Sequence, residues 1–139
     1  MIPKILETSA GFDDILIRLY VVLFYKTQNL TVPPQVAPFI IGEEPANWGE
    51  QVSVICNVLK GDYPIEIKWT LNGEKINPKK HPDIRITKDG KKISFLVIDA
   101  VADHHAGEYA CIASNLVGNS SRSAVLAVNG IFNNKKRLK

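Results

Sequence analysis

Residues 107–111 read Gly-Glu-Tyr-Ala-Cys, and this short run decides the fold of the chain. It ends in Cys111 with Tyr109 two residues earlier, and two landmarks lie upstream: Cys56, and Trp69 thirteen residues after it. Because successive side chains of a strand point to opposite faces, the surrounding runs place both cysteines, the tryptophan and the tyrosine on inner faces. The pattern therefore predicts two strands that bring both cysteines into one core.

Short runs rich in Val, Ile, Phe and Thr recur every eight to fourteen residues between positions 33 and 129. Pairs such as Gly-Asp, Asn-Gly and Asp-Gly, which favour turns, separate them. The runs cover residues 52–58, 65–71, 93–98, 108–114 and 123–128. In the third run, Leu96 and Ile98 are expected to point into the core. No amphipathic helix occurs in this region, so the sequence predicts an all-β sandwich or barrel.

The spacing of cysteine, tryptophan and tyrosine resembles that of immunoglobulin domains. The resemblance implies an immunoglobulin-like β-sandwich with antiparallel sheets A-B-E-D and A′-G-F-C, a short C′ strand, and a disulfide between Cys56 and Cys111. Closing a loop of this size stabilises a fold by about 3–5 kcal/mol. The interval after Trp69 is too short for a C″ strand, which favours the intermediate set over the variable set.

Three further blocks are more specific than this framework. They are Pro33-Pro-Gln-Val36 with Pro38-Phe39, Gly42-Glu-Glu-Pro45, and Lys60-Gly-Asp-Tyr-Pro-Ile65. They are similar to arthropod Dscam, nearest to its alternatively spliced seventh-domain type and to the shortened Dscams of chelicerates. The resemblance implies an extracellular module of a single-pass plasma-membrane adhesion receptor, of the kind used in axon guidance. It also implies two partners, which are identical copies of the domain and the neighbouring immunoglobulin domains of the receptor.

One position departs from the intermediate-set pattern. The residue two before the Gly of Gly-x-Tyr-x-Cys is usually an Asp that pairs with an Arg near strand D, and here it is His105. Arg85 therefore lacks its usual partner, for which Asp103 is a candidate. The neighbouring His104 raises the question of a metal site. Adjacent side chains diverge, however, and no third ligand is recognisable at a useful spacing, so the sequence predicts two solvated histidines in an exposed turn.

The sequence does not predict an enzyme. It lacks a Ser/His/Asp order, a glycine-rich phosphate loop and paired inward carboxylates, so we expect no cofactor, no metal and no small-molecule substrate. Residues 33–129 carry ten Lys/Arg against eleven Asp/Glu, which argues against a nucleic-acid partner. Lys79-Lys80-His81 and Lys91-Lys92 are expected to be solvated turn charges, with contact to a heparin-like polyanion as the alternative.

Strand alternation also predicts a binding face. With the core positions fixed as above, four apolar side chains point outward from the A-B-E-D sheet: Ile55, Ile93, Phe95 and Val97. The outer face of the other sheet is expected to be mostly polar. A contiguous exposed apolar patch marks an interaction surface, so we expect a second copy of the domain to pack here. Arg85 and the nearby Lys88, Lys91 and Lys92 would set specificity.

Two other functions stay open. A structural module of the giant muscle immunoglobulin proteins would have this fold with reduced cysteines inside the cell. An immune-type receptor domain would bind foreign ligands through the loops at Lys60–Tyr63 and Asn115–Asn119. Asn119-Ser-Ser121 is a glycosylation sequon that we expect in the F–G turn, which would fit either extracellular function. A second sequon begins at Asn29.

The two ends of the chain do not fit the β pattern. Ile15–Tyr25 is an apolar run about half as long as a membrane-spanning helix, and Asp13 and Asp14 stand where a signal peptide needs positive charge. We expect residues 1–32 to be an unstructured leader or translated non-coding sequence. Residues 130–139 carry four basic side chains and no acidic ones, and we expect a disordered basic tail.

Overall fold

The computed structural model describes residues 12–28, 31–42 and 45–129. The chain divides into two compact units, Met1–Thr31 and Val32–Lys139. The predicted basic tail, the sequon at Asn29 and the two glutamates at positions 43 and 44 lie outside the described residues.

The first unit contains one helix, α1, over Phe12–Gln28. Its sequence has no Gly or Pro, and contacts between residues four apart support the helix: Asp14 pairs with Arg18 at 3.3 Å, and the rings of Tyr20 and Phe24 stack at 6.3 Å. The expectation of an unstructured leader is therefore wrong for this segment. Among the described residues, no helix combines the length and apolarity needed to cross a membrane.

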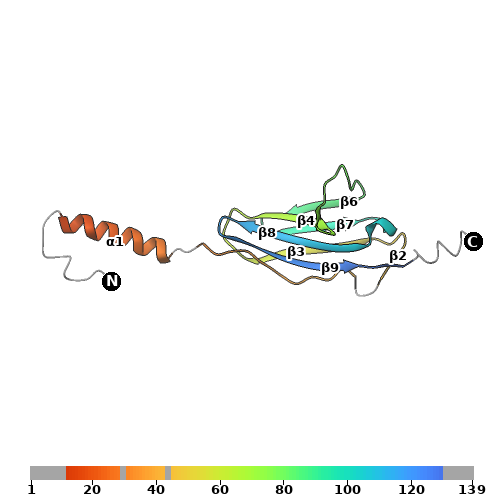
Figure 1. The fold of residues 1–139 in the computed structure, drawn as a ribbon, viewed down its shortest axis with the longest axis horizontal. Helices are drawn as coiled ribbons and strands as arrows, with labels where there is room; N and C mark the ends of the chain where they lie inside the picture. The colour runs from red at the N-terminus through yellow and green to blue at the C-terminus, as the bar shows by residue number, and fades with distance from the viewer. Residues whose placement is uncertain (1–11, 29–30, 43–44, 130–139) are drawn as a thin grey trace, which may run out of the picture. The chain divides into compact units, whose positions relative to one another are not determined.

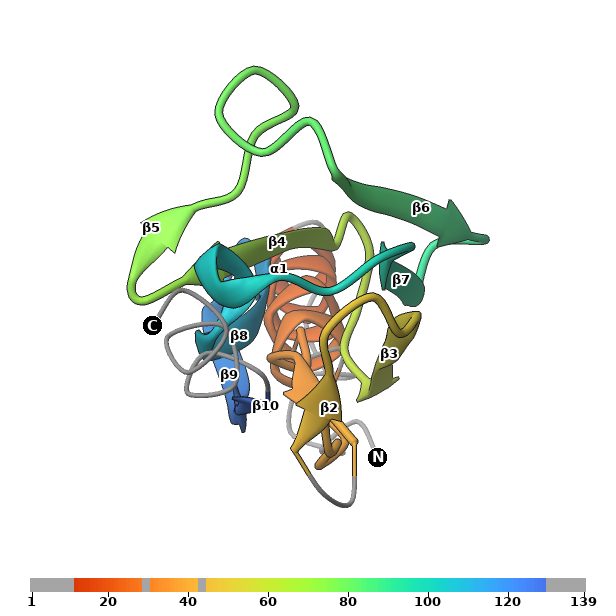
Figure 2. The same cartoon turned by 90° about the vertical axis from the view of Figure 1, so that its right-hand side faces the viewer.

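The second unit is a sandwich of two antiparallel four-stranded sheets (Figure 1). The first sheet has the order β1-β3-β7-β6, with bounds Gln35–Val36, Val52–Lys60, Ile93–Ile98 and Ile84–Asp89. The second has the order β5-β4-β8-β9, with bounds Glu74–Lys75, Glu66–Leu71, Gly107–Asn115 and Gly118–Leu126. Figure 2 shows the two sheets as separate layers.

Three short elements complete the unit. Strand β2, Ala46–Asn47, pairs in parallel with β10, Val128–Asn129, and a 3₁₀ turn over Asp103–His105 connects β7 to β8. These are the predicted sheets, with β1, β3, β7 and β6 as A, B, E and D, and β9, β8, β4 and β5 as G, F, C and C′. The predicted immunoglobulin-like sandwich is confirmed.

The core is built around the predicted framework. Cys56 and Cys111 form a disulfide with a Cα–Cα distance of 6.2 Å, and both are fully buried. The indole Nε1 of Trp69 donates to the hydroxyl of Ser94 at 2.9 Å, which satisfies the polar atom of this large apolar side chain. The hydroxyl of Tyr109 donates to the His105 carbonyl at 2.7 Å. Burial raises the pKa of this tyrosine, so it stays a donor.

Candidate functional site

The outer face of the first sheet is an ordered array of side chains from three strands. Phe95 on β7 lies opposite Ile55 on β3 and opposite Thr87 on β6. The row on one side consists of Ser53, Val97 and Arg85, and the row on the other side consists of Asn57, Ile93 and Asp89. Together with Leu59, these residues are called the β3–β7–β6 face below. Phe95 is at its centre.

The burial pattern agrees with the predicted alternation. On β3 every second residue from Val52 to Val58 is buried and the others are exposed. On β7 buried residues alternate with half-buried ones, because β3 and β6 cover both sides of this central strand. Ile55 is 52% exposed and Leu59 is 53% exposed. Leu59 was not predicted as part of this face, although the same alternation along β3 identifies it as outward.

Arg85 has a different partner from the one considered for it. Its Nε donates to Asp99 Oδ2 at 3.0 Å and its Nη2 donates to Oδ1 at 2.6 Å, while Gln51 donates to the same carboxylate at 3.2 Å. Hydrogen bonds from Arg85 and then Gln51 lower the pKa of Asp99. Asp99 directly follows β7, and its pair with Arg85 lies at the edge of the face. Arg85 therefore pairs with Asp99 and not with Asp103.

Lys88 does not flank the apolar patch as predicted. It lies opposite Ser94 in the ladder between β6 and β7, and Ser94 is fully buried. Since opposed residues of an antiparallel pair share one side of the sheet, Lys88 projects away from the β3–β7–β6 face. The charges within the three rows of that face are therefore Arg85 and Asp89, which have opposite signs, and Asp99 pairs with Arg85 at the edge of the face.

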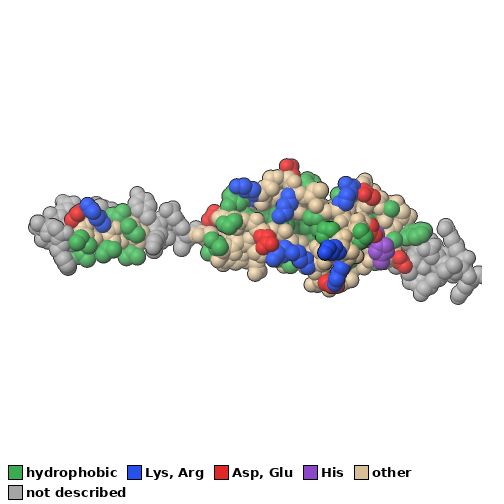
Figure 3. Space-filling model, turned by 90° about the horizontal axis from the view of Figure 1, so that it is seen from above, with side chains coloured by type: hydrophobic (Ala, Val, Ile, Leu, Met, Phe, Trp, Pro, Cys, Tyr) green, Lys and Arg blue, Asp and Glu red, His purple; other side chains and the backbone are tan. Residues whose placement is uncertain are grey.

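The turn before β8 holds a cluster that the sequence analysis did not find. His105 is 1% exposed, so the prediction of two solvated histidines is wrong for this residue, whereas His104 is exposed. Asp83 Oδ2 lies 2.6 Å from His104 Nε2 and 2.8 Å from His105 Nε2. In Figure 3 a histidine side chain shows at the surface with acidic side chains beside it. Nothing in the sequence marks Asp83, because it precedes β6 by one residue and approaches only through the fold.

Electrostatics keep His105 neutral. Its Nδ1 accepts a hydrogen bond from the Ala102 amide at 2.9 Å, so the neutral ring carries its proton on Nε2. Burial lowers the pKa of His105, against the opposing effect of the Asp83 charge. Burial acts to raise the pKa of Asp83, but hydrogen bonds from His104 and the backbone and the charges of the two histidines lower it overall.

This tautomer decides what the cluster can bind. Ligand atoms of Asp83, His104 and His105 all lie within 4.8 Å of one another, a spacing that a metal ion needs. A ligating histidine must offer a nitrogen lone pair, and His105 has a proton on the nitrogen that faces the others. The geometry of this N–H does not make a hydrogen bond, so the 2.8 Å contact brings a neutral ring against the charged carboxylate of Asp83. Two available ligands do not fit a zinc site.

Asn119 lies in a strand and not in the predicted turn. It is the second residue of β9, is exposed, and pairs with Ser114. By alternation it shares the outer face of the second sheet with Glu66, Lys68, Thr70, Glu108, Ile112 and Val125, which are called the β4–β8–β9 face with it below. The candidate glycan therefore projects from the face opposite to the apolar array.

Comparison with known proteins agrees with this architecture. A family profile described as immunoglobulin domain matches residues 33–115, and the chain belongs to that family. Within it, the chain is 43% identical over 101 residues to the cell adhesion molecule Dscam1 of Drosophila melanogaster, a match that covers 73% of this chain and 5% of Dscam1. The chain thus corresponds to about a twentieth of that relative. The predicted resemblance to Dscam is confirmed.

Two further similarities bear on function. The solved structure of the Dscam1 Ig7 domain, isoform 5, is 47% identical with a TM-score of 0.66, and the match covers 70% of this chain and 97% of that one. The muscle M-line assembly protein unc-89 of Caenorhabditis elegans is 43% identical over 81 residues, covering 58% of this chain and 1% of unc-89.

Proposed function

We propose that this domain is an extracellular recognition module of a single-pass cell-surface adhesion receptor, and that it binds a second copy of itself through the β3–β7–β6 face. The single observation that carries the proposal is the apolar array centred on Phe95, with Ile55 beside it. Similarity to proteins named cell adhesion molecules supports the setting. The disulfide supports an oxidising compartment.

The array is complementary to itself. A two-fold axis that lies in the plane of the face and runs across the strands keeps each strand position and exchanges the two outer rows. Phe95 then faces Phe95, and Ile55 faces Ile55. The exchange brings Arg85 of one copy to Asp89 of the other, and Val97 to Ile93. Within the three rows, the apolar residues meet apolar ones, and Arg85 meets Asp89.

The other face supports this choice of side. It carries the sequon at Asn119 and the charged residues Glu66, Lys68 and Glu108, and Lys68 pairs with Glu66 at 3.4 Å. A glycan at Asn119 would leave the β3–β7–β6 face free. Homophilic recognition of this kind suits neuronal self-recognition and wiring, where changes at the polar rows would alter specificity by mismatch.

Sedimentation equilibrium of residues 32–129 tests the proposal. The double variant Phe95→Asp, Val97→Asp introduces two desolvated charges into the centre of the interface and should abolish concentration-dependent dimers. Val125→Asp is the matched control, since Val125 is 66% exposed on the opposite face. Circular dichroism should show all three proteins folded. Dimers that persist in the double variant would show that this face is wrong.

A structural module is the second candidate function, supported by the similarity to unc-89. In that case a neighbouring domain of the same protein would cover the β3–β7–β6 face, and the isolated domain would stay monomeric at every attainable concentration. The same measurement therefore separates the two functions.

A further inference from the structure

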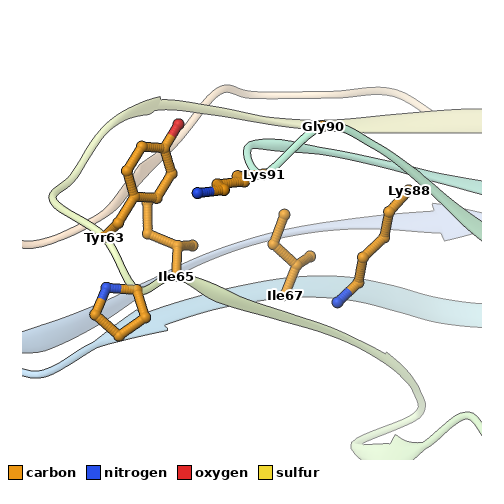
Figure 4. A pocket seen from close by; sticks show the side chains of 7 residues that line it. Tyr63, Ile65, Ile67, Lys88, Gly90 and Lys91 are labelled. Atoms are coloured by element: carbon orange, nitrogen blue, oxygen red, sulfur yellow. The ribbon is translucent and has the colours of Figure 1, made fainter.

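A cavity of about 450 Å³ lies apart from both outer faces, at the end of the sandwich where β4 begins and the β6–β7 hairpin turns. Tyr63, Ile65 and Ile67 line one side of it, and Lys88, Gly90 and Lys91 line the other (Figure 4). Its volume is in the range of ligand sites in proteins. The apolar residues lie on β4 or just before it, and the lysines lie on β6 or in the turn after it, so the cavity lies between the edges of the two sheets.

One wall of the cavity is an unpaired strand edge. The amide of Asn72 donates to Glu108 on β8, whereas the carbonyl of Trp69 accepts from Ile76 on the other side. Backbone groups alternate in direction along a strand, so those of Ile67 point with Trp69 and away from β8. Strand β5 pairs only with Thr70 and Leu71. No described residue hydrogen-bonds the Ile67 amide or carbonyl on this side.

The other wall is cationic and lacks counter-charges. Figure 4 shows Lys88 and Lys91 on the hairpin side, across from Ile67 and Tyr63. The Nζ atoms of Lys91 and Lys92 lie 5.0 and 5.3 Å from the centre of the Tyr63 ring, an arrangement in which the ring holds both cations. Within the described part of the chain, no carboxylate lies within 4.0 Å of any of these three lysine nitrogens.

The nearby acidic groups are engaged elsewhere or point away. Asp62 accepts the Val32 amide at 2.7 Å, and Glu66 pairs with Lys68. Asp89 lies opposite Ile93 and projects toward the β3–β7–β6 face. The positive charge at the cavity is therefore available to a ligand.

We propose that this cavity docks an extended acidic segment of a partner protein, which adds a short strand to the free edge of β4. The amide and carbonyl of Ile67, a buried residue with no described backbone partner on this side, would pair with the segment's backbone. Ile65 and Ile67 would contact an apolar side chain, and Lys88 and Lys91 would contact acidic ones. A sulfated polysaccharide would use the lysines but has no backbone to match the strand edge. The site is separate from the proposed homophilic face and does not depend on it.

The test uses the full chain, labelled with ¹⁵N, and an acetylated octapeptide of alternating valine and glutamate as the probe. Two-dimensional NMR should show saturable shifts at the amides of Ile67, Gly90 and Lys91. A peptide in which every second backbone amide is methylated should lose binding. The double variant Lys88→Gln, Lys91→Gln should weaken binding about tenfold, as expected for two surface ion pairs. Lys75→Gln, Lys79→Gln is the matched control and should bind as the unmodified chain does.

Three results would overturn the proposal. The first is the absence of shifts at millimolar peptide. The second is equal weakening by both lysine pairs, which would indicate unspecific attraction to charge. The third is equal binding of the methylated peptide, or tighter binding of a heparin oligosaccharide at the same residues, either of which would make the site a polyanion site. The Phe95→Asp, Val97→Asp variant should still bind the probe, which separates this result from that of the homophilic proposal.

Discussion

The two outer faces of the sandwich are made by equivalent strands and have opposite character. On the β3–β7–β6 face, Phe95 and Ile55 form the centre, and the charged Arg85 and Asp89 lie on β6 in the two outer rows. On the β4–β8–β9 face, Lys68 and Glu66 pair side by side and Asn119 is open to a glycan. Inner residues are constrained by packing, whereas outer residues are not. The fold does not require the two faces to differ. Their difference is therefore a reason to look for a binding surface on one of them.

Glycans placed on each face give the largest predicted effect. Leu59→Thr would complete an Asn-x-Thr sequon at Asn57, on the β3–β7–β6 face. Protein secreted from eukaryotic cells should carry a glycan there and should lose dimerisation completely, because the glycan covers the contact surface. Sedimentation equilibrium measures the loss, and mass spectrometry confirms occupancy.

The unmodified chain and Asn119→Gln are the controls for this experiment. Both should dimerise equally whether or not position 119 is glycosylated, since Asn119 is on the opposite face. The Leu59→Thr variant made in bacteria, without a glycan, should retain most of its dimerisation. If a glycan at position 57 has no effect and one at 119 blocks dimers, the roles of the two faces are reversed.

Reversing the charge at Arg85 or at Asp89 tests how two copies of the β3–β7–β6 face pair. Arg85→Glu and Asp89→Arg should each weaken self-association about tenfold, because a two-fold interface repeats the mismatched pair. In an equimolar mixture, the glutamate at position 85 of one variant meets the arginine at position 89 of the other, and heterodimers should form more tightly than either variant alone. Analytical ultracentrifugation of one fluorescently labelled variant measures this.

This mixture tests the two-fold arrangement that brings Arg85 of one copy to Asp89 of the other. Arg85→Glu also removes the pair with Asp99, and mixing does not restore this pair. The Arg85→Lys variant, which keeps the positive charge but not the two hydrogen bonds to Asp99, measures how much self-association depends on that pair. A mixture that associates no better than either variant alone would rule out the row exchange.

The smallest predicted effect is a pH dependence of stability that dimerisation does not share. The folded state lowers the pKa of His105, so between this pKa and the ordinary value of about 6.5 the unfolded chain binds more protons. The free energy of unfolding should then fall as the pH falls from 7 toward 5. His105→Gln should flatten this slope in urea titrations, and His104→Gln should keep it. Equal slopes in both variants would assign the effect to another group. The β3–β7–β6 face has no histidine, so dimerisation should not follow the same pH profile.

The sequence predicted what strand alternation controls. Cys56, Trp69, Tyr109 and Cys111 are buried as expected, and Ile55 is exposed as expected. The same rule could have identified Leu59, because the outward series on β3 continues through it.

Contacts between loops were not predictable in this way. Asp99 was overlooked as the partner of Arg85, and Asp83 as the partner of His105, because each approach depends on how a turn packs against a strand edge. The direction of Lys88 depended on the register between β6 and β7, which places it opposite Ser94. The short C′ strand, in contrast, was expected from the sequence, and because β5 pairs only with Thr70 and Leu71, the edge of β4 stays free at Ile67.

The disulfide described in the core has a mechanical consequence whenever the two ends of the domain are pulled apart. It joins positions 55 residues apart, so a pull on the two ends of the domain passes through the covalent bridge and bypasses everything between Cys56 and Cys111. That segment represents about 190 Å of extended chain. Under load the domain can lengthen only through the segments before Cys56 and after Cys111. The β6–β7 hairpin, which contains Phe95 and Val97, lies within the loop that the disulfide closes and bears no tension.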